Sequence, residues 1–204
     1  NFDSVESVIS SFKKFPIKNF FIHKKNAEDE INFRTLSQDS NILPFLDNFH
    51  QISLLWDICR IPDFQKVFND SYIIFLKNIF LTLIKNQGIL PESWLQDRIL
   101  KLENYSGGIE ELSIKIANIR TWTYIANQSQ WIKDFKFWQE KTHKIENNLS
   151  DHLHESLTNR FVDFSASFFM DNKNRGEEAL VEIVEIDDKK CIKLNGQIYG
   201  YING

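Results

Sequence analysis

The stretch of sequence that decides the fold lies in the second half of the chain, between residues 119 and 162. It contains the runs Ile119-Arg120-Thr121-Trp122-Thr123-Tyr124, Trp131, Trp138-Gln139-Glu140-Lys141-Thr142, Leu149-Ser150-Asp151 and Leu157-Thr158-Asn159-Arg160-Phe161-Val162. Three of the five tryptophans fall here, at positions that favour the core over an exposed stacking role. From Trp138 to Phe161 apolar residues recur nearly every fourth position, which predicts one long helix or two helices joined near Ser150.

Upstream of this stretch, apolar residues at helical spacing predict further helices of a bundle. These helices begin near residues 47, 70, 91 and 109, and Pro62, Gly88 and Gly107 mark the ends of the first three. In the segment 70–86 apolar residues point almost all round, which is typical of a helix in the middle of a bundle. Lys77 interrupts this segment and Lys85 ends it after too few residues to cross a bilayer, so we expect no membrane contact.

The two ends of the chain lack the regular apolar spacing of the middle. Residues 1–47 are the least regular part, and we expect an irregular segment that leads in from a longer protein, because the chain starts without Met. Within it, Ser4 or Ser7 could cap a short helix, and Glu28-Asp29-Glu30 is a charged loop or the start of a helix. Residues 171–204 read as a polar linker and a three-strand meander with a turn at Asn195-Gly196. The expected fold class is mainly α, a helical bundle over residues 48–170 with a small C-terminal antiparallel β meander.

Composition argues against several kinds of chemistry. Only Cys59 and Cys191 occur, so there is no disulfide framework and no zinc spacing, and a reducing, cytoplasmic setting is expected. Cys59 is expected to be a core thiol. A phosphate-binding loop is absent, and His152 and His154 are two residues apart on a helix, which favours a solvated face over a metal site. We therefore expect no catalytic residue, metal or cofactor in these residues.

Two stretches have the composition of a nucleic-acid contact. The first runs from Phe12 to Lys25 and holds basic residues interleaved with aromatic ones and no acid, a pattern that suits a single strand. Its candidate residues are Lys13, Lys14, Lys18, Phe20, Lys24 and Lys25. The alternative is an ordinary solvated Lys face over buried Phe side chains.

The second stretch is the tryptophan-rich one. Residues 113–162 carry seven Lys or Arg and five Asp or Glu, a local charge of +2 in a chain of net charge −4. The basic side chains that we expect on one face, for phosphate, are Arg120, Lys141, Lys144 and Arg160. Tyr124 is the candidate for stacking on a base.

The same runs, together with Gln51 to Phe64, resemble the C-terminal region of superfamily II ATP-dependent RNA helicases typified by the mitochondrial degradosome helicase. The resemblance covers roughly residues 49–170 and rests on packing motifs. It implies two RecA-like domains upstream of Asn1 that bind ATP and Mg²⁺ and move along RNA. The C-terminal helices of that family pack across those domains and help to close a channel round the strand.

The resemblance implies an accessory domain that is not an enzyme by itself. Such a domain braces the RecA-like core of the same chain and offers a shallow basic face to single-stranded RNA. Because a channel wall should be more basic than a net charge of −4, either one face alone meets RNA or the domain chiefly braces the core. The alternative function is a protein-docking module that recruits a partner such as a ribonuclease.

Overall fold

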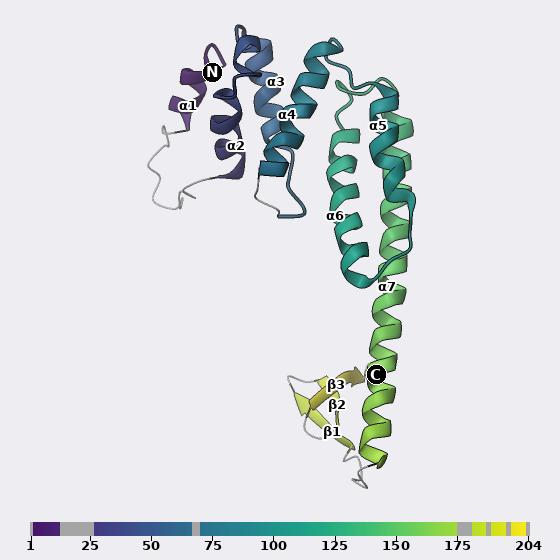
Figure 1. Ribbon diagram of the computed structural model, residues 1–204. Coiled ribbons are helices and arrows are strands. Elements are labelled where there is room, and N and C mark those ends of the chain that lie inside the picture. The colour runs from purple at the N-terminus through teal and green to yellow at the C-terminus, as the bar shows by residue number, and fades with distance from the viewer. Residues whose placement is uncertain are drawn as a thin grey trace. The chain divides into compact units, whose positions relative to one another are not determined.

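The computed structural model describes residues 2–12, 27–66, 70–174, 181–186, 189–194 and 197–202. Contacts divide the chain into two compact units, Asn1–Leu153 and His154–Gly204, and each is described by itself. The described part is mainly helical (Figure 1). Its helices are α1 Val5–Ser11, α2 Glu28–Ser37, η1 Leu43–Phe45, α3 Phe49–Cys59, α4 Asp70–Lys85, α5 Glu92–Ile99, η2 Leu100–Glu103, α6 Ile109–Ala126 and α7 Phe135–Asn174.

The described part of residues 1–47 contains α1, α2 and η1, so both short helices that the sequence left open in this segment are present. α1 begins at the N-cap Ser4, whose hydroxyl oxygen accepts a hydrogen bond from the Ser7 N–H. α2 begins with three acidic residues, which favour a helix N-terminus, and buries Phe33 and Leu36 completely. These residues belong to the same core as the later helices. The sequence left a helix start at Glu28 as one of two alternatives, because one short buried pair is too little periodicity to decide between a helix and a charged loop.

α4 buries Leu76, Ile79, Phe80 and Leu83, and Ile73 and Ile84 also pack against the core, so core contacts surround most of the helix as predicted. Its inward face packs against α2 and α3, and Phe75 makes an edge-to-face contact with Trp122 of α6. Ile74, on another side, is 55% exposed. The helix ends in a Schellman motif, in which Gln87 and Gly88 have positive φ and the Gly88 N–H donates to the Leu83 carbonyl at 2.8 Å.

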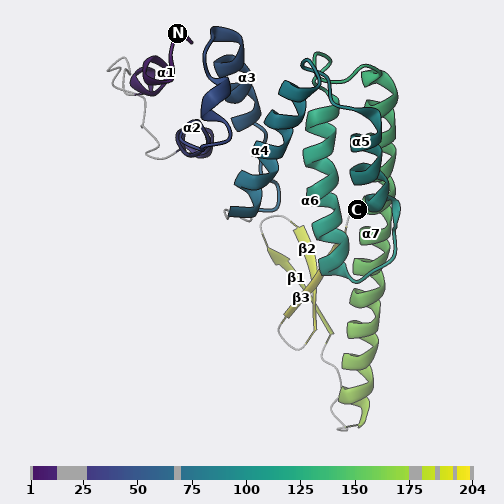
Figure 2. The ribbon, with the colours of Figure 1, turned by 45° about the horizontal axis from the view of Figure 1, so that its top comes forward.

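α5, α6 and the first part of α7 lie side by side in both views (Figure 1 and Figure 2). The sequence predicted either one long helix or two helices joined near Ser150. α7 is one continuous helix, so the first of these predictions is confirmed. Trp122, Trp131 and Trp138 are all buried, which confirms their predicted place in the core. Cys59 is also buried, as predicted, and burial raises the pKa of its thiol far above the usual value.

The second unit contains the part of α7 after Leu153 and three strands, β1 Val181–Ile186, β2 Lys189–Leu194 and β3 Gln197–Ile202. β2 pairs antiparallel with β1 and with β3, and the register shifts between Ile192 and Lys193. α7 runs to Asn174 and takes up the start of the predicted linker. The predicted turn at Asn195-Gly196 lies outside the described residues. Within the described ranges, no helix has both the length and the apolar character to cross a membrane.

Candidate nucleic-acid interface

The packing of α6 against α7 sets the position of Arg120. Ile119 and Ile125 on α6, and Ile145 and Leu149 on α7, are fully buried between the helices and their neighbours. Arg120 directly follows the buried Ile119, so the helical turn carries its side chain from the core to the edge of the bundle. Its side chain remains 51% exposed.

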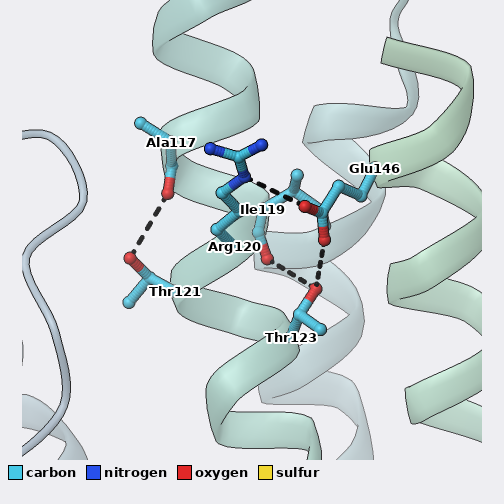
Figure 3. Close-up of polar contacts among 6 residues, drawn as sticks. All are labelled: Ala117, Ile119, Arg120, Thr121, Thr123 and Glu146. Atoms are coloured by element: carbon cyan, nitrogen blue, oxygen red, sulfur yellow. Dashed lines mark hydrogen bonds and ion pairs between the residues drawn. The ribbon is translucent and has the colours of Figure 1, made fainter. Parts of the chain in front are cut away.

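A carboxylate from α7 holds the guanidinium of Arg120. Arg120 Nε donates to Glu146 Oε1 at 3.0 Å (Figure 3). The Thr123 hydroxyl lies 3.0 Å from the Ile119 carbonyl oxygen and 3.3 Å from Glu146 Oε2, so its one hydrogen can be donated to either. Glu146 is more buried than Arg120, with a side chain 21% exposed. The Glu146 carboxylate therefore anchors the Arg120 guanidinium at the surface.

This geometry leaves part of the guanidinium available to an outside group. Within the described part of the chain, the two terminal nitrogens of Arg120 form no hydrogen bond. A guanidinium can present two parallel N–H donors to a phosphate or carboxylate. Glu146 offsets the positive charge but fixes the direction in which these donors point. The pair is chemically suited to holding one phosphate at an exposed edge.

Lys141 is held on a different side of α7. Its ammonium lies 2.6 Å from Glu103 Oε1 of η2, where both side chains are partly exposed. Lys141 and Glu146 are five residues apart, which is about 140° round a helix at roughly 100° per residue. Because Glu146 faces Arg120 and Lys141 faces η2, the structure does not bring Arg120 and Lys141 onto the single face that the sequence predicts.

The remaining candidates are dispersed. Lys144 is exposed and lies two residues before Glu146 on α7. At roughly 100° per residue, the two side chains therefore project about 160° apart round the helix. Tyr124 is half-buried and packs against the core, which restricts its ring as a stacking platform. Arg160 is exposed and belongs to the second unit. The basic and aromatic candidates at Lys13, Lys14, Lys18, Phe20, Lys24 and Lys25 lie outside the described residues.

Sequence reasoning missed the acidic partners of this site. Glu146 and Glu103 each neutralise one of the predicted phosphate contacts. Glu146 stands in the quoted tryptophan-rich stretch, but its spacing from Arg120 by 26 residues identifies no contact. The pairing depends on how α6 and α7 are rotated against each other, which hydrophobic periodicity fixes only coarsely.

Comparisons with known proteins give no relative of this chain. No family model, no curated protein and no solved structure matches it. The resemblance to helicase C-terminal regions therefore stays a prediction that rests on the residues quoted for it.

Proposed function

We propose that this chain is a C-terminal accessory domain of an ATP-dependent RNA or DNA helicase, which braces the RecA-like core and contacts single-stranded nucleic acid. The observation that carries the nucleic-acid part is the half-exposed guanidinium of Arg120, fixed through Nε by Glu146. In this proposal the domain is a helical bundle with a small β meander. ATP and Mg²⁺ belong to the parent helicase.

The bracing part of the proposal is supported by large apolar side chains that remain exposed on the first unit. Covering such side chains with another protein surface lowers the free energy, because apolar area is removed from water. They lie on several elements and include Phe49 of α3, Phe64 after α3, Ile74 of α4, Ile114 of α6 and Phe137 of α7. A domain that contacts its neighbours through several elements resists their rotation better than one that contacts them through a single helix.

The nucleic-acid contact in this proposal is local. A net charge of −4 gives no long-range attraction to phosphate, and two of the candidate cations are already paired with carboxylates. Each phosphate of a single strand that a protein cation neutralises contributes about 0.7 to the magnitude of the slope of log affinity against log salt concentration. We therefore expect a shallow salt dependence, of the size that one or two contacts give.

The test is fluorescence anisotropy of labelled single-stranded RNA with the chain over a salt series. Arg120→Ala should weaken binding at low salt and reduce the slope by about 0.7, because one phosphate contact is lost. The matched control is Lys85→Ala, which removes one exposed positive charge from α4, away from the site. Equal slopes for wild type and Arg120→Ala would remove Arg120 from the interface.

A second substitution separates positioning from charge. Glu146→Gln keeps an oxygen that can accept from Arg120 Nε but removes the negative charge. A phosphate bound at Arg120 should then be held more tightly at low salt. If the chain binds no RNA at any salt concentration, the alternative of a protein-docking module, which recruits a partner such as a ribonuclease, gains weight.

A further inference from the structure

A groove on the first unit carries a chemistry opposite to that of the Arg120 site. It has a volume of about 360 Å³ and lies at the N-terminal ends of α2 and α4, beside the loop that follows α3. Its lining includes three carboxylates, from Glu28, Asp63 and Asp70, and three apolar or aromatic side chains, from Ile31, Tyr72 and Ile73. We call this surface the acidic groove.

Among the described residues that line the acidic groove, the charged side chains are all carboxylates. Arg60, which lines the neighbouring hollow, lies 3.8 Å from Asp57 in an ion pair. Burial raises the pKa of the Tyr72 hydroxyl far above its usual value, and the negative charges of Asp63 and Glu28 raise it further. Phosphate is repelled from such a surface, whereas an ammonium or guanidinium group is attracted.

The groove also has an apolar component. Ile31 is 45% exposed and Ile73 is half-buried, so aliphatic surface borders the carboxylates. Tyr72 is held in place because its hydroxyl donates a hydrogen bond to the Ile61 carbonyl. The face of such a ring attracts cations, so a guanidinium or ammonium that reaches Asp63 is favoured where it meets that face. The surface thus combines charge, apolar area and a rigid aromatic side chain.

We infer that the acidic groove docks a segment of a partner protein in which Lys or Arg side chains alternate with aliphatic ones. Charge complementarity selects the sign of the partner's charge, and the aliphatic surface of Ile31 and Ile73 selects a segment with apolar side chains over a purely polar one. The aliphatic stems of Lys and Arg suit the same surface. This interaction is independent of the helicase proposal, since it uses none of the residues at the Arg120 site.

The experiment measures binding of three labelled synthetic peptides to the whole chain by fluorescence anisotropy. In the first peptide Lys alternates with Leu, in the second Glu replaces Lys, and in the third Ser replaces Leu. We expect the Lys and Leu peptide to bind more tightly than both others. Equal binding of the Lys and Ser peptide would overturn the inference, because charge without apolar contact would then suffice.

Substitutions locate the site. Glu28→Gln combined with Asp63→Asn should weaken binding of the Lys and Leu peptide roughly fivefold, since two attractive charges, one exposed and one partly buried, are removed. Asp63→Asn keeps the side-chain oxygen that accepts from the Gln65 N–H. The control removes two exposed carboxylates elsewhere, by Glu110→Gln and Glu140→Gln. Equal weakening by both pairs would overturn the inference, and circular dichroism melts check that each variant folds.

A further variant tests whether another occupant is already present. Replacing Lys13, Lys14, Lys18, Lys24 and Lys25 by Ser removes the basic side chains of the chain's own Lys-rich stretch. An unchanged affinity for the Lys and Leu peptide supports a partner protein as the occupant. A large increase in affinity would show that the chain's own stretch competes for the groove, and would overturn the assignment to a partner. RNA binding by Glu28→Gln with Asp63→Asn should not weaken, which keeps this test separate from the Arg120 test.

Discussion

Asp39 and Lys77 join the turn after α2 to α4 through an ion pair of 2.7 Å between Asp39 Oδ2 and Lys77 Nζ. The hydrogen bond from Lys77 lowers the pKa of the Asp39 carboxyl below its ordinary value of 3.8, partial burial opposes this, and the Asn41 N–H lowers it further. A carboxyl with a lowered pKa in the folded state contributes stability above 3.8, and that contribution is lost as the pH falls through the folded-state pKa.

Lys77→Met should therefore make the stability of the chain less sensitive to acid. The measurement is the melting temperature of both proteins from neutral pH to below 3.8, where the difference between them should shrink as Asp39 is protonated. Lys85→Met serves as the control, because Lys85 is exposed on the same helix and forms no ion pair among the described residues. Parallel pH curves for wild type and Lys77→Met would contradict the prediction.

The residues themselves show what the sequence could predict at this scale. Trp122, Trp138 and Cys59 are core residues as expected, because burial of an apolar side chain follows from helical spacing alone. The partner of Arg120 was not predictable, since the contact with Glu146 depends on the relative rotation of two helices. The sequence identifies Lys and Arg side chains as candidate phosphate contacts. Only the fold shows which of these side chains already form an ion pair with a carboxylate.

Among the elements, α2 has a place in the core that the sequence, which left a charged loop or a helix start at Glu28, did not specify. Phe33 is completely buried and makes edge-to-face contacts with Phe12 and with Trp56 of α3, with ring centroids 6.1 and 5.8 Å apart. Phe33→Ala should lower the free energy of unfolding by about 3–5 kcal/mol, the usual cost of truncating a buried aromatic ring. Urea denaturation of the whole chain, followed by tryptophan fluorescence, measures this change.

The control lies two residues earlier on the same helix. Ile31 is 45% exposed, so Ile31→Ala should cost less than about 1 kcal/mol. If Phe33→Ala were as mild as Ile31→Ala, α2 would not be part of the core. A ten-residue helix with an acidic first turn offers too few apolar positions for a repeat to stand out, although the tertiary contacts make it integral.

For the whole molecule, the buried apolar residues indicate which part of the chain can fold alone. Among the residues whose side chains the structure describes, every buried apolar residue lies between Val8 and Leu149, inside the first compact unit. The sequence predicted a helical domain over residues 48–170. The first compact unit, Asn1–Leu153, begins earlier and ends earlier than that domain, for separate reasons. The first differs because α1 and α2 join the core. The second differs because the apolar spacing of α7 continues after Leu153, where Leu157 and Phe161 are 48% and 57% exposed.

A chain that ends after Leu153 should therefore unfold in one cooperative step at nearly the melting temperature of the full chain, because it keeps the whole described core. A chain that ends after Gln139 should not fold cooperatively, since it loses Ile145, Leu149 and the Glu146 carboxylate that holds Arg120. Calorimetry distinguishes the two, and a broad, low transition for the longer fragment would contradict the division. RNA titration of that fragment then separates the roles of the two units. If its salt slope equals that of the full chain, the phosphate contacts reside in the first unit, where Arg120 lies; if the slope falls by about 0.7, the second unit supplies one contact, for which Arg160 is the candidate.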